Sequence, residues 1–407
     1  MTSTLIGKRG LRISMARILW LSWCGGGNLP PSLGIAKALE MRGHTVTFVG
    51  RREMVPRAHA AGFAAVELTE SYAQLESYPA DNPVRGMICY LTSPAVASQA
   101  ADTVRHLNPD ITIVDAKFVA ALSATSDLSC PSVVVCHTLF YRMLDTWREH
   151  LKTLSDLRKD AGFSSLPCLD DLWFTRQGVI VTTLASLDAP REWSDHAGYS
   201  SQVHHVGPVL DWNAPQCSPV LTCTSAAGRP VVLLSFSTQP EQRYLANFQN
   251  TLDALEDMPV HVVATTAGAI RLEEVRRTSN SMIVEYADHD SLMEHASLVV
   301  THGGHGTVMR AIKHGVPLIL LPGIAPDQET VAAACQEWGV GRVVPQDADV
   351  ETMRRLIENV LWQPGYRARA EELREQVTAA KGASSAALKI EVNLDVKSHP
   401  SPLELFR

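Results

Sequence analysis

Residues 297 to 317 read SLVVTHGGHGTVMRAIKHGVP, and this stretch decides which fold we expect for the chain. Its apolar start predicts a buried strand that ends at Thr301, and a glycine-rich turn then leads into a helix. Glycine lets the backbone come close to a ligand, and the first N–H groups of a helix lack partners and attract negative charge. The alternative is a tight turn that simply needs glycine. The stretch predicts a phosphate site formed by His302, Gly303, Gly304, His305, Gly306 and Thr307.

The same order of strand, turn and helix recurs along the chain. Expected strands lie at 17–23, 45–49, 111–114, 132–136 and 179–183 in the first half, and at 231–236, 261–264, 282–285, 298–301 and 317–321 in the second. Helical periodicity fills the intervals at 31–42, 95–107, 242–256, 306–314, 328–338 and 350–361. This alternation predicts an α/β protein with parallel sheets that helices cover on both faces.

A stretch without regular periodicity separates the two halves. Residues 211 to 230 hold three prolines and several serines and threonines. We predict a first domain at 1–213 with a loose extension at 1–14, a linker at 214–229, and a second domain at 230–407 whose last helix packs back on the first domain. Both domains are expected to be doubly wound, Rossmann-like units that face each other across a cleft. Ligands bind outside the carboxyl ends of such strands, so the cleft is the expected site.

The composition excludes some classes of function. The net charge of the 407 residues is −7, which argues against a nucleic-acid binder, because such proteins usually carry a basic stripe. No apolar run is long enough to cross a bilayer, and the N-terminal residues are not typical of a signal peptide. The eight cysteines lack Cys-x-x-Cys pairs and zinc-site spacings. We therefore expect a cytoplasmic protein with reduced thiols, and a homodimer stays open.

Two further polar segments belong to the expected cleft. Asp327 and Gln328 follow the strand at 317–321 and offer acceptors and donors that suit sugar hydroxyls, although an aspartate here is also a favoured helix cap. Ser237 and Thr238 follow the first strand of the second half. Their hydroxyl groups either face the cleft or bond their own backbone in an ordinary turn.

The order and spacing of these pieces resemble a known family. The segments RPVVLLSFST at 229–238, VEYADH at 284–289, the turn at 302–307, Gly315 to Pro317 and the Asp327-Gln328 pair resemble the donor-binding half of the UDP-glycosyltransferase superfamily. Within it, the chain resembles the bacterial, antibiotic-type members of the family-1 glycosyltransferases. The resemblance implies a GT-B fold and the transfer of a sugar, with inversion, from a nucleotide diphosphate to an acceptor.

The resemblance also implies roles for single residues. The diphosphate would be held by His302 and the turn to Thr307 with Ser237 and Thr238, the nucleobase would lie by Tyr286 and Ala287, and the sugar would be bound by Asp327 and Gln328. Asp288 departs from the family, which most often has proline there. The triplet Asp288-His-Asp290 spells the Asp-x-Asp of metal-dependent glycosyltransferases of another fold, but it opens a helical segment and we interpret it as a cap. We expect no metal and no cofactor, since the nucleotide sugar is a co-substrate.

The first half carries the matching opening of this family. Residues 17 to 46, RILWLSWCGGGNLPPSLGIAKALEMRGHTV, resemble the family's Gly-His-x-x-Pro turn, the helix after it and the second strand. The family's catalytic histidine removes the acceptor proton and is oriented by an aspartate. Asn28 stands in the place of that histidine, whereas Asp115 keeps the place of the aspartate. An amide cannot act as a general base near neutral pH.

Three explanations of this departure stay open. Asp115 acts as the base, directly or through water; His137, which follows the strand at 132–136, takes over the role; or the acceptor is acidic or nucleophilic enough to need little help. Asn28 would then position the acceptor by hydrogen bonds. For His137, the alternative is a histidine that is satisfied at the end of a strand.

The segment 139–175 contains aromatic residues among charged ones. Phe140, Tyr141 and Trp147 suit helices and a loop around a bulky apolar acceptor, with ordinary packing against the sheet as the alternative. The sequence thus predicts a glycosyltransferase of natural-product or antibiotic biosynthesis. Its donor would be a UDP- or dTDP-linked hexose or deoxyhexose, and its acceptor a small apolar molecule. A catalytically weak helper of a partner enzyme, which Asn28 favours, and a sugar-nucleotide epimerase of the same fold are the other hypotheses.

Overall fold

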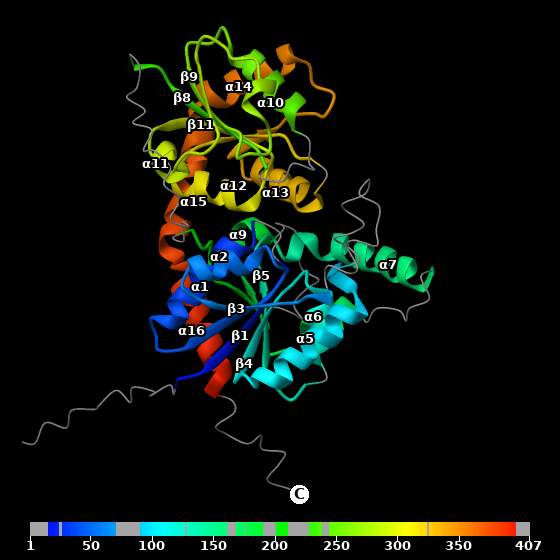
Figure 1. Cartoon of the computed structure of the whole chain (residues 1–407). Coiled ribbons are helices and arrows are strands. Elements are labelled where there is room, and N and C mark those ends of the chain that lie inside the picture. Colours follow the sequence, from blue (N-terminus) through cyan, green and yellow to red (C-terminus); the bar gives the residue numbers. More distant parts are fainter. Residues whose placement is uncertain are drawn as a thin grey trace, which may run out of the picture.

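The computed structural model describes residues 15–23, 27–70, 90–126, 128–160, 168–174, 176–189, 201–210, 228–237, 244–323 and 325–395. Over these residues the chain forms two parallel sheets, which Figure 1 shows as two units stacked one above the other. The strand orders are β3-β2-β1-β4-β5-β6-β7 and β10-β9-β8-β11-β12-β13. Both orders reverse beside the first strand of the unit, as in Rossmann-like domains. The prediction of two doubly wound α/β units is confirmed.

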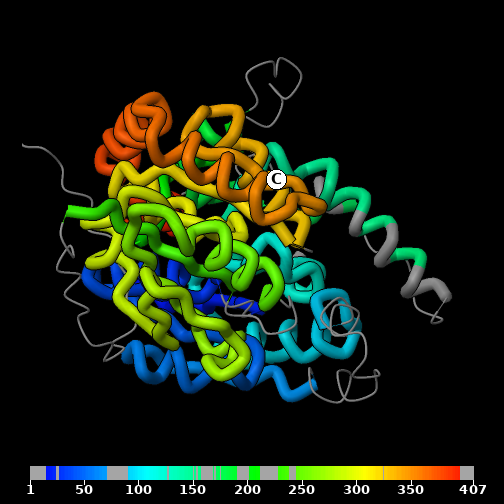
Figure 2. Tube along the Cα trace, turned by 90° about the horizontal axis from the view of Figure 1, so that it is seen from above, coloured from blue at the N-terminus to red at the C-terminus, as the bar shows by residue number. Residues whose placement is uncertain are grey.

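The first unit is built from short strands joined by helices. Its strands are β1 (Arg17–Ser22), β2 (Thr45–Gly50), β3 (Ala64–Glu67), β4 (Ile111–Asp115), β5 (Ser132–Cys136), β6 (Val179–Val181) and β7 (Val203–His205). Its helices are α1 (Leu29–Glu40), α2 (Met54–Ala60), α5 (Pro94–Leu107), α6 (Val119–Ser126), α7 (Leu144–Asp160), α8 (Leu169–Phe174) and α9 (Ala185–Asp188), with a 3₁₀ turn η1 at Tyr141–Met143. Figures 1 and 2 both show α7 projecting from the side of this unit.

The second unit repeats the plan. Its strands are β8 (Val231–Ser235), β9 (His261–Thr265), β10 (Ser281–Val284), β11 (Ala296–Thr301), β12 (Leu318–Leu320) and β13 (Gly341–Val343). Its helices are α10 (Leu245–Leu255), α11 (His289–Met293), α12 (His305–Lys313), α13 (Pro326–Glu337), α14 (Val350–Trp362), α15 (Pro364–Ala380) and α16 (Gly382–Asp395), with a 3₁₀ turn η4 at Leu272–Glu274.

The central strands are buried along their whole length because helices cover both faces of each sheet. Every residue of β4, β5 and β8 is buried, and these runs are rich in valine, isoleucine and leucine, as expected for interior parallel strands. The sequence missed β3, β7 and β13. These strands are only three or four residues long, and β3 is an alanine-rich edge strand in which no residue is fully buried. Such short edge segments carry little apolar signal.

The end of the described chain returns to the first unit. Figure 1 shows α15 and α16 running from the second unit down along the first, where α16 packs against α1. Glu391 of α16 is 2% exposed and accepts hydrogen bonds from the guanidinium of Arg42. Nε2 of His44 lies 3.0 Å from the same carboxylate. These contacts fix α16 on the first unit.

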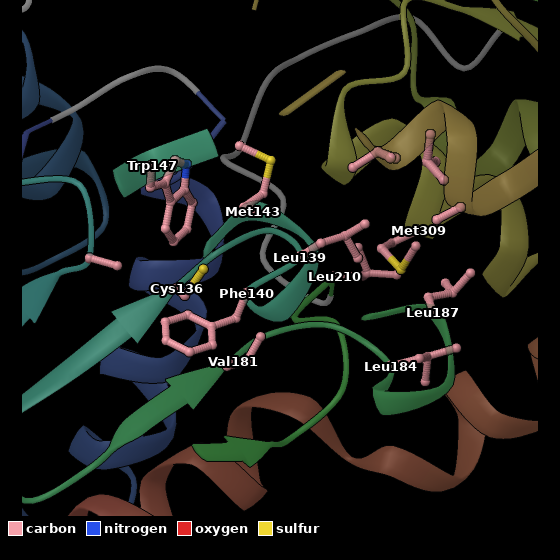
Figure 3. Close-up of a cluster of buried hydrophobic side chains, with 14 of the residues drawn as sticks. Cys136, Leu139, Phe140, Met143, Trp147, Val181, Leu184, Leu187, Leu210 and Met309 are labelled. Atoms are coloured by element: carbon pink, nitrogen blue, oxygen red, sulfur yellow. The ribbon is translucent and has the colours of Figure 1, made fainter. Parts of the chain in front are cut away.

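Apolar and polar contacts also join the two units directly. Figure 3 shows Leu184 and Leu187, at and beside α9, in one cluster with Met309 of α12. Nearby, Nη1 of Arg142 pairs with Oε2 of Glu337 at 2.8 Å. The two units therefore share one hydrophobic cluster and do not merely touch at their surfaces.

Some expectations fall on residues that the structure does not describe. The extension at 1–14 and all but the last two residues of the linker at 214–229 lie outside the described residues, and so does Thr238. None of the described helices combines the length and the apolar composition that crossing a membrane would require.

Candidate active site

The residues singled out in the sequence gather at the carboxyl ends of the two sheets. Asn28 follows β1 and Asp115 ends β4, and these strands are the neighbours at which the order of the first sheet reverses. Ser237 follows β8 and His302 follows β11, at the corresponding place in the second sheet. A ligand crevice is expected at such reversal points.

Asn28 and Asp115 form a buried pair at the place where the family resemblance implies a histidine and an aspartate. Asn28 directly precedes α1, but its side chain makes no cap bond and reaches β4 instead. Its Nδ2 donates to Oδ2 of Asp115 at 2.8 Å. Oδ1 of Asp115 accepts hydrogen bonds from Nε1 of Trp23 at 3.1 Å and from the backbone N–H of Lys117 at 2.9 Å. The carboxylate thus orients the amide as it would orient an imidazole.

The surroundings of Asp115 make its carboxylate more basic than usual. The residue is only 4% exposed. Burial raises the pKa of Asp115, and the hydrogen bond from Asn28 and the charge of Lys117 oppose this shift without cancelling it. A base of this kind is better matched to neutral pH than an exposed aspartate.

His137 is held between two hydroxyl groups. Its Nε2 lies 2.9 Å from Oγ of Ser32 on α1, and its Nδ1 lies 3.1 Å from Oγ1 of Thr182 after β6. Burial, assisted by the nearby charges of His305 and Lys117, lowers the pKa of His137 to about 3. Both ring nitrogens are engaged, so the geometry is that of a histidine satisfied at the end of a strand.

The turn into α12 contains a buried histidine and three glycines, which differ in backbone conformation and in the space around them. His302 is 9% exposed, and burial lowers the pKa of its imidazole to about 4. Gly303 has a φ of 85°, which favours glycine. A Cβ on Gly304 would lie 2.5 Å from Nε2 of His302, whereas a Cβ on Gly306 would meet nothing within 4 Å. Gly304 therefore makes room for the imidazole, and the space beside Gly306 is open.

Asp327 and Gln328 lie in the first turn of α13 and have different partners. The cap position of this helix is Ala325, so the interpretation of Asp327 as the cap is wrong. Oδ2 of Asp327 pairs instead with Nζ of Lys117 at 3.5 Å. Oε1 of Gln328 accepts hydrogen bonds from the hydroxyl of Tyr244 at 2.7 Å and from the N–H of Gly323 at 2.9 Å. Asp327 thus faces the other unit, and Gln328 fixes the loop before its helix.

The remaining donor-side residues differ in exposure. Ser237 is buried, and Tyr286 after β10 is 46% exposed beside the half-buried Ala287. His305 begins α12, and its Nε2 is buried without a hydrogen-bond partner among the described residues. Burial lowers the pKa of His305 to about 4, although Asp327 and Asp188 act to raise it. A neutral imidazole thus faces charged groups of both units.

The triplet at 288–290 behaves as a helix cap. Oδ1 of Asp288 accepts the N–H of Asp290 at 3.0 Å, and its Oδ2 accepts the hydroxyl of Ser291 at 2.7 Å. Asp290 pairs with Arg310 and with Nζ of Lys313 on α12, the latter at 3.3 Å. In the part of the chain that the structure describes, no His, Cys, Asp and Glu side chains group as they would around a metal ion.

The expected acceptor residues differ in burial and in their contacts. Phe140 is fully buried, and its ring lies 5.2 Å from Trp173 and 6.2 Å from Trp147, as Figure 3 illustrates for Trp147. Phe140 therefore belongs to the core, where packing accounts for it. Trp147 is 7% exposed, and Nζ of Lys117 lies 5.8 Å from its ring centroid. Tyr141 is half-buried with its ring 5.6 Å from that of His205.

Sequence reasoning missed three residues that shape the site, namely Trp23, Lys117 and Tyr244. Lys117 stands two positions after Asp115, and a polar residue just beyond the end of a strand is a weak indication of a place near the ligand site. Trp23 likewise ends the first apolar run. Tyr244 contacts Gln328 across 84 positions of the sequence, and no local pattern could indicate that contact.

Comparison with known proteins agrees with the geometry. Residues 249–392 match the family described as erythromycin biosynthesis protein CIII-like, C-terminal domain. The chain is 26% identical to 4'-demethylrebeccamycin synthase of Lentzea aerocolonigenes over 92% of this chain and 99% of that protein. It is 32% identical to UDP-glycosyltransferase 2 of Phaeomoniella chlamydospora over 40% of this chain, a match that spans only 37% of that relative.

The fold is also that of a solved glycosyltransferase. The structure of CalG4, the calicheamicin glycosyltransferase, matches with a TM-score of 0.74 and 21% identity, and the match covers 96% of this chain and 100% of that one. The chain therefore has the two-domain fold of this solved glycosyltransferase, and in sequence it is similar to enzymes whose names place them in bacterial antibiotic and other natural-product pathways.

Proposed function

We propose that the chain transfers a hexose or deoxyhexose from a UDP- or dTDP-linked donor to a small, bulky and apolar natural product, with inversion and without a metal ion. The observation that carries the proposal is the line of contacts from Asn28 and Asp115 through Lys117 to Asp327. It joins the acceptor side of the first unit to the sugar-binding side of the second. Such a line suits a reaction between two substrates that meet in the cleft.

The donor side would stabilise the leaving group. The acceptor oxygen attacks the anomeric carbon while the bond from this carbon to the diphosphate oxygen breaks, so the negative charge of the departing nucleotide grows. We propose that the first N–H groups of α12 and the imidazole of His302 receive this charge. Thr307, Ser237 and Thr238 would add hydrogen bonds. Asp327 would bind the sugar hydroxyls, and Tyr286 with Ala287 would lie by the nucleobase.

We further propose that Asp115 receives the acceptor proton, directly or through one water molecule. Its raised pKa supports this role, whereas His137 is a weak base with both nitrogens engaged. Asn28, which Asp115 orients, would position the acceptor by hydrogen bonds. An acidic phenol or a nucleophilic nitrogen as acceptor would reduce the need for a base.

A second candidate is a helper protein that binds the nucleotide sugar or a partner enzyme without turnover. Asn28 favours this candidate, because it removes the histidine of the family pair. The proposed donor residues speak against a helper that only binds a partner enzyme, since such a scaffold has no need for His302, Asp327 and Gln328 together.

The experiment that tests the proposal is an assay of the purified full chain. UDP- and dTDP-linked sugars are offered with a panel of apolar aglycones and EDTA. Mass spectrometry should detect a product heavier by one sugar, and NMR should show the anomeric configuration inverted. Binding of the nucleotides without any product across the panel would favour the helper, and retention would contradict the mechanism.

A further inference from the structure

The side chain of Lys117 reaches from the first unit to a carboxylate of the second. Lys117 follows β4 by two residues, and its Nζ lies 3.5 Å from Oδ2 of Asp327 on α13. The two side chains are 30% and 27% exposed, so the pair is partly shielded from water. The backbone N–H of the same lysine donates to Oδ1 of Asp115 at 2.9 Å. One residue thus touches the carboxylates of both substrate sides.

We propose that Lys117 is a positioning residue that couples the two sides, because it orients Asp327 toward the donor sugar and favours the ionised form of Asp115. The inference rests on the proposed function, and it adds a residue and a specificity to it. Lys117 would act on the sugar of the donor rather than on its diphosphate.

The geometry explains why the sugar is the affected part. A carboxylate has two oxygens with about four acceptor sites between them. Lys117 engages Oδ2 of Asp327, and the backbone N–H of Asp327 itself also interacts with the carboxylate, so these two contacts use about half of the acceptor sites. The diphosphate site at the start of α12 is a separate element, and it has His302 as its own donor.

The lysine itself is held in place by packing. Nζ lies 5.8 Å from the ring centroid of Trp147, within reach of a cation–π interaction. Trp147 in turn packs edge-on against Trp173, with ring centroids 5.1 Å apart. The lysine therefore loses little further freedom when a substrate binds.

Charges around the lysine and the aspartate agree with this role. Burial works to lower the pKa of Lys117, but the charges of Asp327 and Asp115 outweigh it and raise the pKa, so the ammonium stays charged. The other groups that face Asp115 are the neutral Asn28 and Trp23 and the thiol of Cys136, whose pKa burial raises. Lys117 hence supplies a positive charge that lowers the pKa of Asp115.

Calorimetry on the full chain tests the inference with Lys117→Met, Lys117→Arg and, as a matched control, Lys313→Met. Lys313 also forms a partly exposed ion pair, at 3.3 Å with 34% of its side chain exposed, but it lies at the far end of α12. The probes are UDP, dTDP and their glucose conjugates. We expect Lys117→Met to lower the affinity for the sugar nucleotides roughly 10-fold and to leave the affinity for UDP and dTDP unchanged. Lys117→Arg should recover part of the lost affinity. Lys313→Met should match the wild type with every probe.

A pH profile of kcat/KM gives a second readout that a purely structural role would not move. Removal of the positive charge raises the pKa of Asp115, so the acid limb of Lys117→Met should shift to higher pH, and Lys117→Arg should restore it. Equal losses for sugar nucleotide and free diphosphate, or an unshifted limb, would overturn the inference. If the wild type binds no nucleotide at all, the proposed function is wrong. If the wild type and Lys117→Met bind the sugar nucleotides equally well, only the inference about Lys117 is wrong.

Discussion

Asn28 is the residue at which we expect the chemistry of this chain to depart from that of the family it resembles. The resemblance implies a histidine at this place, and the amide of Asn28 contacts Asp115 at 2.8 Å, as an imidazole would in a histidine–aspartate dyad. Its side chain is only 8% exposed, and it is therefore fixed rather than mobile. The departure can be reversed by one substitution, which makes it testable.

We expect Asn28→His to raise kcat toward ordinary hydroxyl acceptors by about 10-fold or more, since a general base contributes about 10²–10⁴ in rate. The variant should gain an acid limb near the histidine pKa of about 6.5. Asn28→Ala should lose activity only modestly, and Asp115→Asn should lose more. If Asp115→Asn and His137→Ala both turn over as fast as the wild type, the acceptor supplies its own nucleophilicity.

His302 gives the second prediction at this scale. His302→Ala should lower the affinity for UDP and dTDP about 10-fold in calorimetry, because the variant lacks the proposed hydrogen bond from the imidazole to a phosphate oxygen. With a pKa of about 4, the imidazole is neutral, so the affinity should not rise between pH 8 and pH 6. His261→Ala is the control, since His261 begins β9 at the end of the sheet away from the site. Unchanged affinity in His302→Ala would remove the histidine from the donor site.

At the scale of elements, the turn into α12 is where conformation and chemistry coincide. Gly303 supplies a left-handed residue, and Gly304 supplies space for the ring of His302. The helix that follows offers its unpaired N–H groups to the cleft. Each glycine has a separate physical reason, so the substitutions have separate expected effects.

Gly304→Ala should displace the ring of His302, because the added Cβ would lie 2.5 Å from its Nε2. We expect nucleotide affinity to fall about as far as in His302→Ala, while the double variant should lose little more than either single variant. Gly365→Ala on α15 is the matched control, because a Cβ there meets nothing within 4 Å. Additive losses in the double variant would mean that the glycine acts on the phosphate directly.

Activity should also survive EDTA, because helix N–H groups and a neutral histidine can receive the leaving charge. Asp288 caps α11, and Asp290 is engaged by cations of α12. The measurement is product formation with and without chelator, followed by addition of Mg²⁺ or Mn²⁺. Loss of turnover in EDTA with rescue by either ion would reverse this prediction.

At the scale of the whole molecule, burial of neutral histidines couples stability to pH. The pKa values of His289, His302 and His305 are lowered to about 4, and that of His137 to about 3, in each case chiefly by burial. In the unfolded chain these groups titrate near 6.5. Their contribution to stability is therefore complete above pH 6.5 and is lost as the pH falls toward 4.

We expect the thermal unfolding midpoint to fall when the pH drops from 7.5 to 5.5. Each buried histidine should lower the free energy of unfolding by on the order of 1 kcal/mol over this range. The raised pKa of Asp115 makes the folded state more stable as the pH falls, but it is one group against four histidines. Differential scanning calorimetry at the two pH values checks this. A midpoint that stays constant or rises on acidification would contradict the neutral state of these imidazoles.

The sequence by itself determined the features that depend on neighbours along the chain. Apolar runs at strand spacing located ten of the strands, and the glycines before α12 located the turn that we propose binds the diphosphate, because both signals are local. The replacement at position 28 is likewise readable from the order of residues alone. The class of fold followed because alternating strands and helices have few ways to pack.

Only the tertiary structure decided the contacts between distant residues. It put Phe140 in the core rather than at the acceptor, held His137 between Ser32 and Thr182, and brought Lys117 to Asp327 across 210 positions of the sequence. Such contacts depend on how the carboxyl ends of two sheets meet and on how α16 is fixed to the first unit. No pattern within one strand or helix encodes that placement, because it arises from the packing of surfaces that the chain brings together only on folding.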